Sequence, residues 1–151
     1  MANTPHPESK WATVWSGGRR KLACDPVLGP WVKEIGTIRV PMGEDDPFPY
    51  LVRTICYQQL AGRAASTIHS RLVEALSGEV TTRKVLRVRE STLRKAGLSH
   101  AKCAAIRDLA SKISVGDVVV SDLSEQSDRE VIRRLVQVRG IGVWTAQMYL
   151  M

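Results

Sequence analysis

Short apolar runs with helical spacing follow one another along most of this chain, and glycine, proline or a capping residue separates each from the next. Apolar side chains that recur every three or four residues indicate helices with one buried face. Ser, Thr or Asp precedes several runs and glycine closes several, as expected at helix starts and ends. The sequence therefore predicts an all-α fold, an orthogonal bundle of about seven or eight short helices.

The strongest helical periodicity lies in the middle of the chain, with a further run near the C-terminus. These helices are expected over residues 50–56, 64–76, 85–88, 91–96, 99–113 and 128–136. An earlier helix is expected from Asp25, as its N-cap, to Ile35, with Gly29 and Pro30 dividing it into two pieces. Residues 115–120 are rich in valine and could form either a strand or a loop.

We expect one folded domain over residues 21–151 and a mobile arm over residues 1–20. The arm carries two prolines, Gly17 and Gly18, and little apolar periodicity. A chain of 151 residues can bury a hydrophobic core without disulfides or metals.

The composition limits the function classes. The formal net charge of +7 indicates a polyanionic partner, most often nucleic acid, and the alternative is a basic solvated surface. Three cysteines lie far apart without metal-ligand spacing, so we expect no metal and no cofactor. No apolar run is long enough to span a membrane and no signal sequence is visible, so we expect a cytoplasmic protein.

A glycine hairpin, Gly140–Gly142, lies between an apolar helical run and a helix that opens through Trp144. Glycine is needed where φ is positive and where the backbone must approach a ligand closely. The N–H groups of residues 142–145 would face outward at a helix N-terminus, which is a site suited to a phosphate. The alternative is an ordinary turn between two helices.

Three polar or aromatic residues could complete a DNA-binding surface. Trp144, beside the hairpin, could stack on a base, although a core tryptophan is the interpretation that sequence alone favours. Gln58 and Gln59 follow an apolar helix face and precede a break at Gly62. Their amides could probe a minor groove or fill a gap in a base stack; the alternative is a solvated pair.

A second tight turn, at Gly97, is flanked by basic residues. They are Arg94, Lys95, Lys102 and Arg107. These side chains could line a track of phosphates, or they could form the charged face of an amphipathic helix.

Taken together, four segments resemble DNA-3-methyladenine glycosylase II, a family of the helix-hairpin-helix glycosylase superfamily. They are Asp25-Pro-Val-Leu, Phe48-Pro-Tyr-Leu-Val-Arg-Thr-Ile-Cys-Tyr-Gln-Gln-Leu, Ala96-Gly-Leu-Ser-His-Ala-Lys and Val138-Arg-Gly-Ile-Gly-Val-Trp-Thr-Ala. The resemblance covers about residues 22–151, with the four segments in the family's order.

The resemblance implies a monofunctional base-excision repair enzyme. Such an enzyme flips an alkylated purine, such as 3-methyladenine or 7-methylguanine, out of double-stranded DNA and hydrolyses its N-glycosidic bond. The resemblance implies phosphate binding by Gly140, Ile141, Gly142, Val143 and Thr145, a base pocket lined by Trp144, and a minor-groove wedge formed by Gln58 or Gln59. In glycosylase-lyases of the superfamily, the Trp144 position holds a Schiff-base lysine, so lyase chemistry is not expected. The expected partner is alkylated double-stranded DNA, bound by a monomer that does not associate with a membrane.

The chain departs from the family pattern at its C-terminal end. The family's catalytic Asp lies farther beyond the hairpin than Met151, and no Asp or Glu occurs between Gly140 and Met151. We therefore expect a C-terminally truncated glycosylase domain that has no catalytic residue and is inactive by itself. The alternatives are a non-catalytic helix-hairpin-helix module that binds duplex DNA, and a helical protein without a nucleic-acid role.

Overall fold

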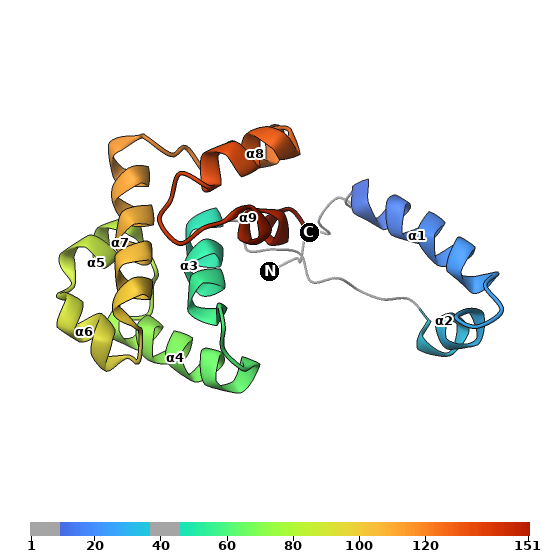
Figure 1. Ribbon diagram of the computed structural model, residues 1–151, viewed down its shortest axis with the longest axis horizontal. Coiled ribbons are helices and arrows are strands. Elements are labelled where there is room, and N and C mark those ends of the chain that lie inside the picture. Colours follow the sequence, from blue (N-terminus) through green and yellow to red (C-terminus); the bar gives the residue numbers. More distant parts are fainter. Residues whose placement is uncertain (1–9, 37–45) are drawn as a thin grey trace, which may run out of the picture. The chain divides into compact units, whose positions relative to one another are not determined.

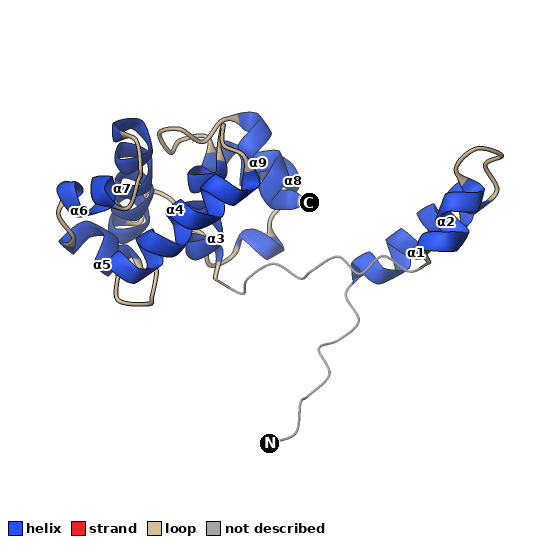
Figure 2. Ribbon diagram, turned by 90° about the horizontal axis from the view of Figure 1, so that it is seen from below, coloured by secondary structure: helices blue, strands red, loops and turns tan. Residues whose placement is uncertain are grey.

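The computed structural model describes residues 10–36 and 46–151, with side chains described from residue 17 onward. All regular structure in these ranges is helical, without a strand (Figures 1 and 2). The helices belong to two compact units, residues 1–42 and 43–151. The predicted all-α class is therefore confirmed.

The first unit is a pair of helices, α1 (Lys10–Ala23) and α2 (Gly29–Ile35), that pack on each other. A Cβ atom at Gly29 would lie only 2.6 Å from the Ala23 carbonyl oxygen, so the tight connection requires glycine there. The Asp25 carboxylate accepts the N–H groups of Val27 and Leu28 in this connection, at 2.8 and 2.9 Å. Asp25 therefore caps the turn before α2, and α2 itself begins at Gly29.

Helix α1 occupies much of the segment that the sequence predicts as a mobile arm. Gly17 and Gly18, in the middle of α1, weaken the helical signal of this segment. Packing against α2 can outweigh such weak local propensity. Residues 1–9 lie outside the described residues, and the division into an arm over residues 1–20 and a domain over residues 21–151 stays a prediction.

The second unit contains the remaining helices. They are α3 (Pro47–Tyr57), α4 (Gly62–Ala75), α5 (Thr82–Arg87), α6 (Glu90–Lys95), α7 (His100–Val115), α8 (Asp128–Leu135), α9 (Val143–Leu150) and a 3₁₀ turn over Leu123–Glu125. Helix α7 contacts α3, α5 and α6, so it is the central helix of the unit (Figure 1). Helix α9 contacts α8 and also reaches α3, where the rings of Tyr50 and Tyr149 meet edge to face.

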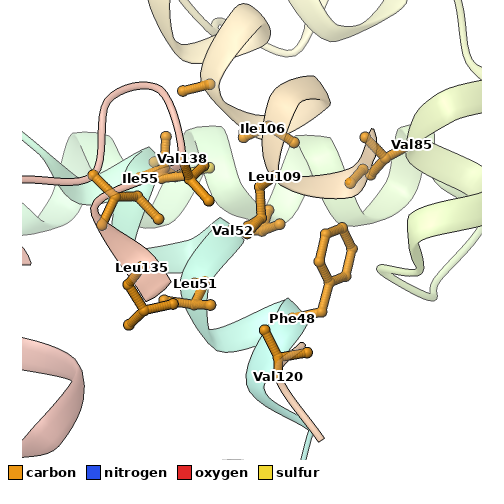
Figure 3. Close-up of a cluster of buried hydrophobic side chains, with 14 of the residues drawn as sticks. Phe48, Leu51, Val52, Ile55, Val85, Ile106, Leu109, Val120, Leu135 and Val138 are labelled. Carbon is orange, nitrogen blue, oxygen red and sulfur yellow. The ribbon is translucent and has the colours of Figure 1, made fainter. Parts of the chain in front are cut away.

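The core of this unit lies between α3, α7 and the segment that comes after α8. Val52 and Ile55 of α3 meet Ile106 and Leu109 of α7, and Val138 joins them from the segment before α9 (Figure 3). All five side chains are buried. Apolar burial of this kind is the main favourable term in folding, so the core fixes α3 and α7 as a common base for the C-terminal hairpin.

The valine-rich segment after α7 forms a loop, which is one of the two alternatives that its sequence allows. Val118 and Val120 are nevertheless buried against the core. In residues 10–36 and 46–151, none of the helices has the length and apolar character needed to cross a membrane.

Candidate nucleic-acid interface

The glycine hairpin connects α8 to α9 through two tight turns. The N–H of Val138 donates to the Leu135 carbonyl, and the N–H of Ile141 donates to the Val138 carbonyl, each at 3.1 Å. The side chains of Val138 and Ile141 are both buried in the core. Ile141 therefore anchors the hairpin, and its amide is already engaged in the turn. Phosphate binding by Ile141, which the sequence interpretation includes, therefore stays a prediction that its engaged amide does not support.

The backbone geometry requires glycine at only one of the two glycine positions of the hairpin. Gly140 has φ +79°, and a Cβ atom there would lie 3.0 Å from the Cβ of Ala105 on α7. Gly142 has φ −92° and ψ 175°, which any residue adopts, and a Cβ atom there would meet nothing within 4 Å. The fold therefore requires glycine at position 140, whereas Gly142 leaves open space in front of α9.

Helix α9 begins without a side-chain cap. Asp46, Ser99 and Ser127 each accept a backbone N–H at the starts of α3, α7 and α8, but Gly142 has no side chain to do so at the start of α9. Within the described part of the chain, the N–H groups of residues 142–145 have no acceptor. Because a helix N-terminus carries partial positive charge, these open amides form a site that attracts an anion.

Helix α7 holds the residues that lead into the hairpin. The Asp108 carboxylate accepts the N–H of Arg139 at 2.7 Å and the Lys112 ammonium at 2.9 Å. The same ammonium donates to the Gln137 carbonyl at 2.6 Å. Burial alone would raise the pKa of Asp108, but the bonds from Arg139 and Lys112 outweigh it and hold this pKa below its usual value.

Trp144 lies on the first turn of α9 with 70 % of its surface exposed. The interpretation of Trp144 as a core residue is therefore wrong for this structure. An exposed indole beside open helix amides presents a flat face at the same surface as the anion site.

The turn between α3 and α4 lies next to the hairpin, and the side chains of its two glutamines have different surroundings. The Gln58 side-chain amide donates to the Gly140 carbonyl at 2.9 Å and to the Thr145 hydroxyl at 3.3 Å. Gln59 has φ +57°, is exposed, and makes no side-chain hydrogen bond with the described residues. Thr145 itself is buried, and its hydroxyl accepts the bond from Gln58. The Thr145 N–H has no backbone acceptor among the described residues.

Leu60 is not among the residues predicted from the sequence. It comes directly after Gln59 at the turn, and 40 % of its surface is exposed. An apolar residue that directly follows two glutamines, two positions before the break at Gly62, is the signal that could have identified it.

Most of the basic residues near Gly97 are engaged within the protein. Lys102 donates to the carbonyls of Cys56 and Gln58 at 2.7 and 2.8 Å, and Arg107 donates to the Val88 carbonyl at 2.9 Å. Arg94 donates to the carbonyl of Leu98. These three side chains satisfy carbonyl groups at helix ends and turns, so the prediction of a phosphate track is wrong for them.

Comparisons with known proteins agree on one family. Residues 52–145 match the model of the HhH-GPD superfamily base excision DNA repair protein. The chain is similar to DNA-3-methyladenine glycosylase 1 of Schizosaccharomyces pombe, with 31 % identity over 79 % of this chain and 54 % of that protein. It is also similar to the DNA-3-methyladenine glycosylase of Saccharomyces cerevisiae, with 33 % identity over 85 % of this chain and 49 % of that protein.

Solved structures give the same result. The 3-methyladenine DNA glycosylase of Schizosaccharomyces pombe in complex with abasic DNA superposes with a TM-score of 0.79 and 28 % identity, over 87 % of this chain and 67 % of that one. The DNA-3-methyladenine glycosidase of Bacillus halodurans gives a TM-score of 0.74 and 31 % identity, over 88 % and 62 %. The chain spans about half the length of the curated relatives it matches. The family match includes both the α3–α4 turn and the hairpin.

Proposed function

Because the chain belongs to the HhH-GPD superfamily of base excision DNA repair proteins, we propose that residues 43–151 grip damaged double-stranded DNA as part of an alkylpurine glycosylase. The observation that carries this proposal is the uncapped N-terminus of α9 behind Gly142. It supplies several unpaired amides at one exposed point. A phosphate of the DNA backbone is the ligand whose charge and size such a point suits.

The phosphate contacts are proposed for the amides of Gly142, Val143 and Thr145, with that of Trp144 between them. Gly140 shapes the bend, and Ile141 anchors it in the core. The absence of a side chain at Gly142 lets a bulky phosphate approach these amides closely. This contact would position the protein on DNA without reading its sequence.

The α3–α4 turn is proposed to enter the minor groove. Gln59 is the better candidate for the wedge because its side chain is exposed and unengaged among the described residues, whereas that of Gln58 is bonded to the hairpin. Leu60 would accompany it, since exposed apolar side chains insert between base steps and unstack them. An inserted side chain would occupy the space that an extruded base leaves.

Trp144 is proposed to line the pocket that receives the extruded base. Its exposed ring can stack on a purine. Alkylated purines such as 3-methyladenine and 7-methylguanine carry positive charge, and a cation is attracted to the face of an indole. This attraction would favour alkylated over normal purines.

Hydrolysis of the N-glycosidic bond would need a carboxylate to stabilise the positive charge that develops on the sugar. Residues 140–151 contain no Asp or Glu. Asp108, next to the hairpin, is already bonded to the Arg139 amide and Lys112. We therefore propose that residues 1–151 bind alkylated DNA but do not release the base by themselves. The second candidate function, favoured by the same observation, is a non-catalytic DNA-binding module.

Two measurements test this proposal. The first is incubation of the chain with methylated duplex DNA, where we expect no release of 3-methyladenine. Measurable release would show that a carboxylate of this chain serves in catalysis. The second is duplex affinity at several salt concentrations, which should fall steeply as salt rises.

The Gly142→Asp variant makes the affinity measurement specific. A carboxylate at this position would cap α9 and repel phosphate, so duplex affinity should fall at least tenfold. Ser91→Asp is the matched control because it adds the same charge on α6, outside the hairpin, and we expect a small change. Equal losses in the two variants, or an affinity that does not respond to salt, would contradict the proposed DNA grip. The monomeric state and the cytoplasmic location remain predictions.

A further inference from the structure

We infer that Gln58 is a positioning residue that holds the hairpin in its DNA-binding geometry, rather than a residue that touches DNA. This inference rests on the proposed function of the hairpin. It assigns different roles to two adjacent glutamines, which their sequence alone does not distinguish.

The two acceptors of the Gln58 side chain lie on either side of Gly142. One is the carbonyl of Gly140, in the bend, at 2.9 Å, and the other is the hydroxyl of Thr145, on the first turn of α9, at 3.3 Å. A glutamine amide has two N–H bonds, so it can serve both acceptors at the same time. Gln58 thereby links the bend at Gly140 to the first turn of α9.

The backbone of Gln58 is itself held in place. The Lys102 ammonium donates to the carbonyls of Gln58 and Cys56, at 2.8 and 2.7 Å, where α3 ends. Hydrogen bonds from a charged donor are stronger than those between neutral groups. Lys102 therefore fixes the point from which the Gln58 side chain reaches the hairpin.

Helix α7 is the common support of both partners. It supplies Lys102 to the end of α3, Asp108 to the amide of Arg139, and Ala105 to the close contact with Gly140. Gln58 completes this arrangement by joining the end of α3 directly to the hairpin. The proposed wedge at Gln59 is the next residue, so the same link sets the distance between the wedge and the phosphate site.

Hydrogen exchange in the DNA-free chain tests the link directly. Gln58→Met keeps the length of the side chain but removes its donor, and Gln59→Ala is the matched control. In Gln58→Met, the N–H of Ile141, which is bonded within the turn, should exchange about three- to tenfold faster, and the amide resonances of Gly140 and Gly142 should shift. Gln59→Ala should leave them unchanged.

A double-mutant cycle on duplex affinity separates positioning from direct contact. If Gln58 acts through the hairpin, the double variant Gln58→Met/Gly142→Ala should lose less binding free energy than the two single variants lose in total. The losses of binding free energy in Gln58→Met and Gln59→Ala should be additive, because Gln58 would act on the hairpin whereas Gln59 would contact DNA directly. The opposite pattern would assign Gln58 to the wedge and overturn the inference.

The two measurements distinguish a failure of the proposed function from a failure of the positioning role. If the unmodified chain does not bind duplex DNA, the proposed function fails, and the exchange rate of Ile141 still decides whether Gln58 holds the hairpin. If Gln58→Met binds DNA poorly while the exchange rate of Ile141 stays unchanged, the positioning role is wrong and the DNA-binding proposal stands.

Discussion

Two turns of this protein each contain a glycine with positive φ, but the helices that follow them begin differently. The turn before α7 has Gly97 at φ +105°, with Ile68 of α4 3.0 Å from where its Cβ would be. The turn before α9 has Gly140 at φ +79°, with Ala105 of α7 at the same distance. In both turns, a left-handed glycine packs closely on a neighbouring helix.

The two helices begin differently. Ser99 accepts the Lys102 amide at 3.2 Å and caps α7, whereas α9 starts at Gly142 without a cap. Capping stabilises a helix by satisfying its first amides. The start of α9 therefore gives up this stabilisation and keeps its amides open, as a binding site for an anion requires.

The largest expected effect concerns Gly140. Gly140→Ala should lower the free energy of unfolding by about 2 kcal/mol, because alanine resists a left-handed φ and its Cβ would crowd Ala105. Gly142→Ala should change the same quantity by less than about 0.5 kcal/mol. Urea unfolding of the two variants checks this, and equal losses would show that the two glycines do not differ as their geometry indicates.

The next effect concerns the missing cap. Gly142→Ser would make the start of α9 resemble that of α7, so stability should rise by a few tenths of a kcal/mol. The serine side chain would also occupy the amides proposed for phosphate, and duplex affinity should fall about tenfold. Thermal unfolding and a DNA titration check the two parts. A variant that gains stability and binds DNA normally would argue against the open amides as the binding site.

The converse change removes the existing cap. Ser99→Ala should cost about 1 kcal/mol of stability, since the amide of Lys102 loses its acceptor. Duplex affinity of the folded protein should stay the same. A large loss of affinity, measured under conditions where the variant is fully folded, would mean that the α7 turn also takes part in DNA binding.

The smallest effect is a pH dependence that belongs to the hairpin. The pKa of Asp108 is held below its usual 3.8, so its ionised form is favoured in the folded state. Its contribution to stability is present above that pH and is lost as the pH falls through the lowered pKa. Asp108→Asn should reduce the acid sensitivity of unfolding by up to about 1 kcal/mol. Identical curves of stability against pH for the variant and the parent would contradict this role.

The sequence predicted the helical class and most helix positions because these depend on nearby residues. The cap at Ser99 and the bend at Gly140 each depend on a few neighbouring side chains. The family resemblance is confirmed by the match over residues 52–145. Helix α1 was not predicted, since its glycines weaken the local signal and packing on α2 overcomes it.

The roles of long polar side chains could not be predicted in this way. Lys102 and Arg107 belong to a pattern typical of phosphate binding, yet they donate to carbonyls of other segments. The exposure of an apolar side chain was equally hard to predict. The residue type of Trp144 is typical of a core position, but Trp144 is exposed. In each case, the partner or its absence depends on how distant parts of the chain meet.

By itself, the sequence determined that this chain forms short helices, that it bends at Gly140, and that it carries the motifs of one DNA repair superfamily. Only the tertiary structure decided that Gln58 faces the hairpin, 82 residues away, while Gln59 faces solvent. The physical reason is the distance along the chain over which each interaction acts. Helix periodicity and capping act within one or two turns of chain, whereas a hydrogen bond between segments exists only after the core has brought them together.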